Sequence, residues 1–264
     1  MSSLIADRLP VRLTPLVGRE RELQDVVDSL SRSRLLTLTG PGGVGKTRLA
    51  LAATGAVDAC YPGGVCWVEL APVDDPGIVA QVIARQLSVP DSPGEDPATA
   101  IVEYVGDRSL LIVLDNCEHL ASAAAVLAGQ LLGTCDALSI LATTREVLGV
   151  EGEHSWPVPP LSLPEAEVPS AAATAAESDA VRFFENRAQL VFPSFQIDDH
   201  NAPTVVQICR RLDGLPLAIE LAAAQLRMLS VGQLAERLDD IFTVLAGGPR
   251  TAPHRQQALR ATLD

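Results

Sequence analysis

One segment constrains the fold of this chain more than any other, and it is residues 40–47, with the sequence GPGGVGKT. It fits the pattern G-x-x-x-x-G-K-[ST], the phosphate-binding P-loop. The apolar, β-branched run Leu35–Thr39 before it predicts a buried strand, and the helix-forming run Thr47–Ala53 behind it predicts a helix. A strand–loop–helix context is the one in which this motif binds phosphate.

The glycines of the loop allow successive backbone N–H groups to point inward around an anion, and the N-terminus of the following helix adds its partial positive charge. The residues that we expect to bind the phosphates are Gly42, Gly43, Val44, Gly45, Lys46, Thr47 and Arg48.

Two side chains of the loop have more specific predicted roles. Lys46 would reach the β- and γ-phosphates, and the hydroxyl of Thr47 would help to hold Mg²⁺. Lys46 is the only lysine of the chain, since the other nineteen basic residues are arginines. The alternative, a glycine-rich turn with a chance lysine, does not explain why the one lysine stands where a compact ammonium contacts phosphates.

The composition limits the remaining possibilities. The 264 residues suffice for one large domain, or for one domain and a smaller one, and a hydrophobic content of 47% with only 3% aromatic residues predicts an aliphatic core. The net charge of −13 and the pI near 4.7 argue against a broad basic face that grips nucleic acid. Any contact with DNA is therefore expected through other domains of a longer protein.

The cysteines and the N-terminus indicate the compartment. The five cysteines form no C-x-x-C pair, so buried, reduced thiols are expected rather than a metal or redox site. The first residues lack a signal peptide, and no uncharged apolar run approaches the length of a membrane span. We expect a cytoplasmic protein without a membrane partner.

Strands and helices alternate over the first 160 residues. Apolar runs predict strands at Leu35–Thr39, Val65–Leu70, Leu110–Leu114, Leu138–Ala142 and Ser155–Val158. Helices are predicted between them, including one from about Glu118 to Leu132. Because each strand is apolar throughout, the fold class is α/β, with a parallel sheet covered by helices on both faces in a three-layer sandwich.

The second part of the chain is predicted to be a small all-α domain. Its third helix, Leu217–Met228, is apolar nearly all round, and a capping box, Ser230–Gln233, opens the fourth, with Leu234, Leu238 and Ile241 pointing inward. The predicted division is a leader (1–16), a P-loop nucleotide-binding domain (17–160), a linker (161–178), a helical domain (179–246) and a tail (247–264).

Asp115 closes the most apolar strand of the chain. A carboxylate at the carboxyl end of such a strand lies where ligands bind in open α/β sheets. We interpret it as the Walker B aspartate, which acts on Mg²⁺. The alternative is a plain strand-ending aspartate, which the P-loop upstream makes less attractive.

Arg145 and Glu118 are the other candidate catalytic residues. Arg145 follows the strand after Asp115, where a guanidinium can sense the γ-phosphate, and the alternative is a surface arginine at a helix start. Many P-loop ATPases have a second carboxylate directly after the Walker B aspartate, but this chain has Asn116 there. Glu118 is then either the replacement that activates water or a cap of the following helix. We expect His119 to be a helix-surface or packing residue.

Taken together, these segments resemble the nucleotide-binding module of bacterial STAND ATPases, the NB-ARC-like module of large LuxR-type and SARP-type transcriptional activators of actinobacteria. The resemblance covers nearly the whole chain. The motifs that carry it are VGRE at 17–20, the P-loop, LDNCEH at 114–119, ATTRE at 142–146, WPVPPL at 156–161 and RLDGLPLAIE at 211–220.

The resemblance implies more than the residues do by themselves. It implies the sheet order 5-1-4-3-2 with a helical domain behind it, and ATP and ADP as ligands. Adenine would be held by Val17, Gly18 and Arg19 and by Pro216, and Arg145 would be the sensor. ADP would lock a closed resting state, and exchange for ATP would open the molecule and let it form a homo-oligomer until hydrolysis resets it.

The chain also departs from the pattern. Members of that family continue into a winged-helix domain, and the tail 247–264 is expected to lead to one that this chain does not contain. The histidine by which the winged helix often contacts the β-phosphate of ADP is then absent as well.

Three functions compete on these grounds. The first is a nucleotide-dependent regulatory switch with slow ATP hydrolysis. The second is a motor ATPase of the AAA+ kind, and the third is a scaffold that binds nucleotide without hydrolysing it. Asn116 and the segment around Pro216 favour the switch, and no acceptor-binding motif of a small-molecule kinase is present.

Overall fold

The computed structural model describes residues 9–10, 14–90, 94–165 and 172–238. Most of the predicted leader, part of the linker, Ile241 and the tail 247–264 lie outside the described residues. The described chain divides into two compact units. Of the described residues, the first unit contains those up to 15, those at 21–40 and those at 46–158, and the second contains those at 16–20, at 41–45 and from 159 onward.

The first unit is built on a five-stranded parallel sheet with the order β2-β3-β4-β1-β5. The strands are β1 (Leu35–Thr39), β2 (Val65–Glu69), β3 (Leu110–Asp115), β4 (Leu138–Thr143) and β5 (Glu153–Pro157). This is the order 5-1-4-3-2 read from the other edge, so the prediction is confirmed. The strands β1 to β4 are buried along nearly their whole length, because helices cover the sheet on both faces, and their side chains are accordingly mostly apolar.

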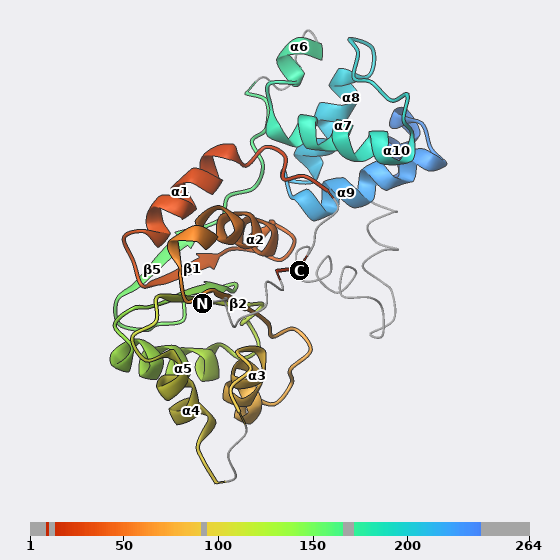
Figure 1. Cartoon of the computed structure of the whole chain (residues 1–264). Helices are drawn as coiled ribbons and strands as arrows, with labels where there is room; N and C mark the ends of the chain where they lie inside the picture. The colour runs from red at the N-terminus through yellow and green to blue at the C-terminus, as the bar shows by residue number, and fades with distance from the viewer. Residues whose placement is uncertain (1–8, 11–13, 91–93, 166–171, 239–264) are drawn as a thin grey trace. The chain divides into compact units, whose positions relative to one another are not determined.

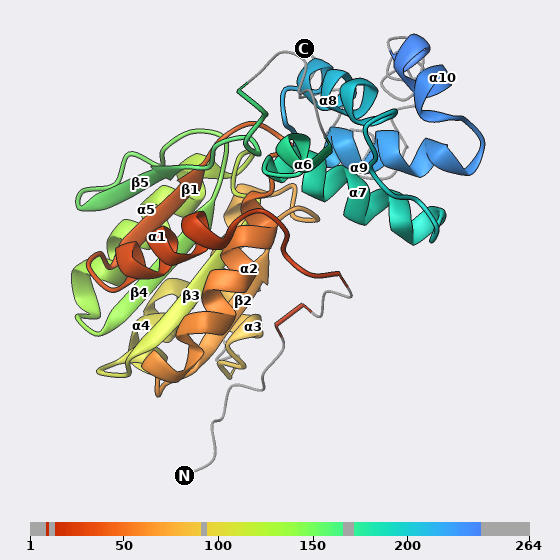
Figure 2. The same ribbon diagram turned by 90° about the horizontal axis from the view of Figure 1, so that it is seen from above.

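Helices form a layer on each side of this sheet. Figure 1 shows α1 and α2 on one face and α3, α4 and α5 on the other, and Figure 2 shows α1 and α2 in front of the strands. The bounds of these helices are α1 (Glu20–Leu30), α2 (Lys46–Val57), α3 (Val79–Gln86), α4 (Pro97–Val105) and α5 (Ala121–Thr134), and short 3₁₀ turns stand at η1 (Asp58–Cys60) and η2 (Pro76–Ile78).

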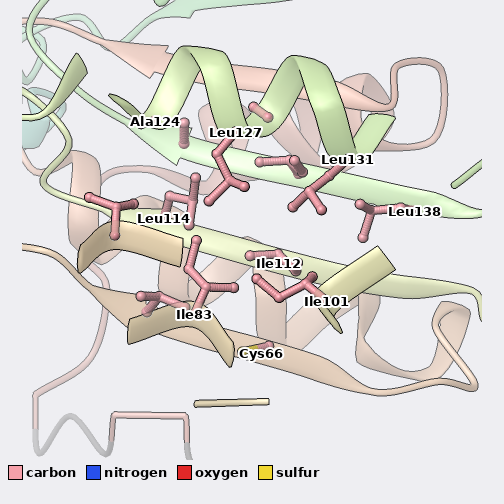
Figure 3. Packing of buried hydrophobic residues seen from close by; sticks show 14 of the residues in the cluster. Cys66, Ile83, Ile101, Ile112, Leu114, Ala124, Leu127, Leu131 and Leu138 are labelled. Carbon is pink, nitrogen blue, oxygen red and sulfur yellow. The ribbon is translucent and has the colours of Figure 1, made fainter. Parts of the chain in front are cut away.

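The main core of this unit lies between the sheet and α3–α5. Every second residue of β3 and β4 points into it, as Ile112, Leu114 and Leu138 illustrate, and they meet side chains such as Leu127 of α5 (Figure 3). Because side chains alternate along a strand, Asp115 at the end of β3 points to the opposite face, the one covered by α2. The core therefore fixes the side of the sheet on which the polar groups gather.

The second unit is helical. Its elements are α6 (Ala172–Ala175), α7 (Asp179–Val191), α8 (Ala202–Arg211), α9 (Pro216–Ala224), the 3₁₀ turn η3 (Gln225–Arg227) and α10 (Val231–Glu236). They share a core of small and aliphatic side chains with Phe183, Phe184 and Phe195, and the rings of Phe184 and Phe195 meet edge to face. The predicted small all-α part is thus present in the described residues.

The expected helix Leu217–Met228 is wrong in its C-terminal part. The α-helix ends at Ala224, and the N–H of Met228 bonds to the carbonyl of Gln225, three residues back, which tightens the last turn. Met228 is 85% exposed rather than central. The capping box is confirmed, since Ser230 and Gln233 bond reciprocally at the start of α10.

Candidate functional site: a P-loop with a hydroxyl–carboxylate pair

The first turn of α2 carries the two reactive side chains of the P-loop, both in the first unit. Lys46 begins the helix and is buried, and its ammonium donates a hydrogen bond to the carbonyl of Gly40, 2.7 Å away. Burial lowers the pKa of Lys46, opposed by the charges of Glu118 and Asp115 and aided by that of Arg145. The ammonium is therefore held in a site that favours the arrival of a negative charge.

Thr47 and Asp115 are brought together from different elements. The hydroxyl of Thr47 in α2 donates to Oδ1 of Asp115 at the end of β3, 2.8 Å away. Both groups are oxygen donors of the kind that Mg²⁺ prefers, and a hydroxyl and a carboxylate at the end of a P-loop strand fit that ion. The chemistry of the donor set therefore agrees with a bound Mg²⁺.

Thr143, the last residue of β4, is a polar partner that the sequence analysis missed. Its hydroxyl donates to the same Oδ1 of Asp115, 2.6 Å away, and accepts the backbone N–H of Asn116 at 2.9 Å. Thr143 is 1% exposed. The sequence contains a signal for this role, because Thr143 is the last residue of a buried strand, and that strand is the next one in the chain after the strand that ends at Asp115.

Asn116 has a backbone conformation that explains its residue type. Its φ is +65°, in the left-handed region that asparagine tolerates better than most residues. In this conformation its N–H meets Thr143, and the N–H of Cys117 bonds to the carbonyl of Thr143 at 2.9 Å. The asparagine directly after Asp115 is therefore explained by the left-handed backbone conformation that this position adopts.

Glu118 and Arg145 form an ion pair, with Oε1 and Nε 3.3 Å apart. The alternative that Glu118 caps the next helix is wrong, because α5 begins only at Ala121 and its N-cap, Leu120, makes no side-chain bond. Residues 117–120 instead form a turn closed by the N–H of Leu120 on the carbonyl of Cys117. The alternative that Arg145 begins a helix is also wrong, since the described residues after β4 contain no helix before β5.

His119 packs against the chain. Its Nε2 lies 2.7 Å from the carbonyl oxygen of Val73, and His119 itself is in a turn and not in a helix. Arg48 is likewise committed to a structural contact, because its guanidinium donates to the carbonyls of Thr14 and Pro15. A phosphate contact at position 48 would therefore come from its backbone N–H in the first turn of α2.

The second unit contains the middle of the P-loop. The buried guanidinium of Arg19 donates to the carbonyl of Val44 at 3.1 Å, and the N–H of Leu217 donates to the carbonyl of Gly43 at 3.2 Å. Gly43 has φ +76°, and a Cβ there would lie 2.9 Å from that of Leu217. The loop therefore needs glycine at position 43 for its conformation and for this close approach.

The segment predicted to hold adenine is anchored in the same unit. Gly18 has φ +68° and packs against Asp179, since a Cβ at Gly18 would lie 2.5 Å from that of Asp179. Arg182 links Asp179 to Glu20, with N–O distances of 3.2 and 3.7 Å. Pro216 is the first residue of α9 and lies near Gly45. A Cβ atom added at Gly45 would lie 4.0 Å from Cγ of Pro216.

Burial raises the pKa of Cys66, Cys117 and Cys209 to about 12, and Cys60 is exposed. No group of three or more potential metal-ligating His, Cys, Asp or Glu residues occurs in the part of the chain that the structure describes. Over the same residues, none of the helices has the length and apolar character needed to cross a membrane.

The five-stranded parallel sheet, together with the P-loop between β1 and α2, defines a P-loop nucleotide-binding fold. The family profile of the NB-ARC domain matches residues 19–154, which is more than half of the chain. The chain therefore belongs to the NB-ARC family, and the resemblance inferred from its motifs is confirmed. It is a nucleotide-binding module of the kind found in regulatory proteins.

Relatives of this module occur within longer proteins. A Mycobacterium tuberculosis protein named as an HTH-type transcriptional regulator is 48% identical over 235 residues, which are 89% of this chain and 25% of that protein. An uncharacterised protein of the same species is 41% identical over 96% of this chain and 61% of its own length. The regulatory protein AfsR of Streptomyces coelicolor is 29% identical over 88% of this chain and 23% of its own length. The matched part of the chain thus spans 25% of the length of the first of these relatives and 61% of the length of the second.

Solved structures agree on the fold. A STAND protein of Pyrococcus horikoshii, titled as a signal transduction ATPase with a tetratricopeptide repeat sensor, matches with a TM-score of 0.56 and 18% identity over 89% of this chain and 33% of that one. A chain in the structure of Drosophila ORC bound to DNA matches with the same TM-score and 13% identity over 89% of this chain and 70% of that one. At these identities the likeness concerns the fold alone.

Proposed function

We propose that this module binds ATP and ADP with Mg²⁺, hydrolyses ATP slowly, and thereby controls the activity and oligomerisation of a transcriptional regulator. Lys46 would contact the β- and γ-phosphates, and Thr47 and Asp115 would hold the metal ion. The support for these roles is the hydroxyl–carboxylate pair 2.8 Å apart beside a buried ammonium.

The remaining site residues complete the proposal. Arg145 would sense the γ-phosphate, and Glu118 would orient or deprotonate the attacking water. Val17, Gly18, Arg19 and Pro216 would hold the adenine. The domain division at residues 17–160, 161–178 and 179–246 and a cytoplasmic location belong to the same proposal.

The single observation that favours a slow switch is the ion pair between Glu118 and Arg145. The proposed base is occupied by the proposed sensor, so water activation has to wait until Arg145 moves to another anion. A γ-phosphate supplies such an anion, which makes release of the base depend on the third phosphate. A motor ATPase, by contrast, needs a base that is ready in every cycle.

Control of a regulator is proposed from the relatives. The protein named as an HTH-type transcriptional regulator is about four times as long as the matched region, so DNA binding would reside in other domains. The net charge of −13 supports this division, since the module itself offers little attraction to a polyanion. Nucleotide-dependent homo-oligomerisation would then transmit the state of the site.

A phosphate-release assay with Mg²⁺-ATP tests the hydrolysis. We expect slow steady release from the wild type, none from Lys46→Ala, and at least a tenfold decrease in rate for Glu118→Gln, because a positioned base contributes about 10²-fold or more. The matched control is Glu103→Gln, which changes an exposed carboxylate of α4 and should leave the rate unaltered. Fast turnover would support the motor alternative, and no release at all would support the scaffold.

The nucleotide that co-purifies with the protein, and the effect of added nucleotide on its stability, test the proposed ligands ATP and ADP. ADP retained through purification, identified by mass spectrometry after denaturation, is the expected finding for a resting switch. Added ADP or ATP should raise the melting temperature of nucleotide-free protein, because a ligand that binds only the folded state stabilises it. If neither nucleotide shifts the melting temperature, the proposed function is wrong.

A further inference from the structure

Asp115 Oδ1 accepts two hydroxyl hydrogen bonds, and the two donors have different surroundings. Thr47 stands in the first turn of α2, where P-loop proteins use the hydroxyl oxygen for Mg²⁺. Thr143 stands at the buried end of β4 and is 1% exposed. The bond from Thr143 is therefore available to Asp115 with or without a metal ion.

The hydrogen-bond partners of Thr143 determine the direction of its O–H. A threonine hydroxyl has one proton and accepts through its lone pairs. The N–H of Asn116 donates to this oxygen at 2.9 Å, and a carboxylate oxygen, which only accepts, lies at 2.6 Å. The proton of Thr143 must then point to Asp115, and the left-handed backbone of Asn116 keeps the arrangement in place.

We propose that Thr143 is a positioning residue, which holds the carboxylate of Asp115 in the orientation that binds Mg²⁺. A charge-assisted O–H···O⁻ bond of this length, from a buried donor that is itself held by the N–H of Asn116, restricts rotation of the carboxylate and so fixes the direction in which it faces the metal ion. The proposal rests on the proposed function, because it assumes that Mg²⁺ accompanies the nucleotide.

The test is the Mg²⁺ concentration at which ATP gives half of its maximal increase in melting temperature. We expect Thr143→Val to need about tenfold more Mg²⁺ than the wild type, since a lost bond to a charged group weakens binding by about one order of magnitude. Thr143→Ser, which keeps the hydroxyl, should restore a requirement close to that of the wild type. Binding of ADP in EDTA should be the same for all of these proteins, because it does not involve the metal ion.

Thr37 provides a matched control. It is fully buried in β1, next to β4 in the same sheet, and its hydroxyl has no hydrogen-bond partner in the described structure. Thr37→Val therefore makes the same chemical change in the same kind of place. It should leave the Mg²⁺ requirement unchanged, so a general effect of replacing a buried threonine is excluded.

A double-mutant cycle tests whether Thr143 affects the Mg²⁺ requirement through Asp115. In an Asp115→Asn background, Thr143→Val should produce no further change, because the residue acts through Asp115. If Thr143→Val does not fold, Thr143→Ala takes its place in the same comparisons. An equal Mg²⁺ requirement for the wild type and the position-143 variants would overturn the proposal. A wild type without any Mg²⁺-dependent shift would instead overturn the proposed function.

Discussion

Arg145 Nε lies 3.3 Å from Glu118 Oε1, and this contact joins the proposed sensor to the proposed base. The two side chains are 44% and 25% exposed, so water screens the pair, and its contribution to folding is at most about 1 kcal/mol. Such a pair is easily exchanged for a better one. A phosphate group offers more negative charge and several acceptor oxygens to the same guanidinium.

Arg145→Ala should therefore reduce the affinity for ATP about tenfold relative to the affinity for ADP. The reason is that the guanidinium would contact only the third phosphate, and a lost charge-assisted bond of this kind is worth about 1.5–3 kcal/mol. Isothermal titration calorimetry with both nucleotides measures the ratio. Arg108→Ala is the control, since Arg108 is exposed on the first unit and stacks on Tyr104. An equal loss for ATP and ADP would contradict the sensor role.

Lys46→Met should leave the nucleotide-free protein as stable as the wild type, or more stable, at pH 7. The pKa of Lys46 is lowered by burial, so the folded state binds its proton less tightly than the unfolded state does. The wild type should then gain stability relative to Lys46→Met as pH rises through the lowered pKa towards 10.5, the value of an unburied lysine. Urea unfolding of both proteins at pH 7 and at pH 9.5 measures this difference. A wild type that loses stability relative to the variant over this interval would contradict the sign.

Gly214→Ala should destabilise the protein by about 2 kcal/mol or more. Gly214 has φ +65°, and a Cβ there would collide with the carbonyl oxygen of Leu161, whose N–H bonds back to Gly214. Gly232→Ala is the matched control, because Gly232 lies in α10 with nothing within 4 Å of a built Cβ, and alanine favours a helix by up to about 1 kcal/mol. Urea denaturation of both variants tests the opposite signs. Equal effects would mean that the turn before α9 tolerates a side chain.

Cys60 should be the thiol that reacts in the native protein at pH 8. It is exposed, whereas the other four cysteines are buried, and the pKa of Cys66, Cys117 and Cys209 is raised to about 12, so almost no thiolate forms there. Titration with Ellman's reagent should show one fast thiol before denaturation and five after it. Cys60→Ser should remove the fast phase alone, and a remaining fast phase would show that a buried thiol is accessible.

The sequence was sufficient to predict the strands of the sheet, because each strand is indicated by a short continuous run of residues. Leu110–Leu114 is apolar at every position and Leu35–Thr39 consists of leucine and threonine alone, and this pattern has few alternatives beside a P-loop. Lys46, Thr47 and Asp115 follow from motif spacing, and the structure brings the last two into contact. Their roles toward nucleotide and metal remain predictions.

Other features depend on contacts that no local pattern reveals. The role of Thr143 requires knowing that β4 lies next to β3, so that its last side chain meets Asp115. The end of α9 at Ala224 was missed because the apolar pattern continues past the residue where the backbone tightens. The ion pair of Glu118 depends on a turn at residues 117–120 that delays the start of α5.

The bond between Gly43 and Leu217 has a consequence for how this module can vary. Pro216, the first residue of α9, has no N–H to give, so Leu217 is the first residue of that helix that can donate to the loop. Donor and acceptor both belong to the main chain, so replacing the side chain of Leu217 by any residue other than proline leaves the bond possible, whereas position 43 has to remain glycine. The contact between loop and helix is therefore encoded by the path of the backbone, and relatives with different residues at position 217 can keep it.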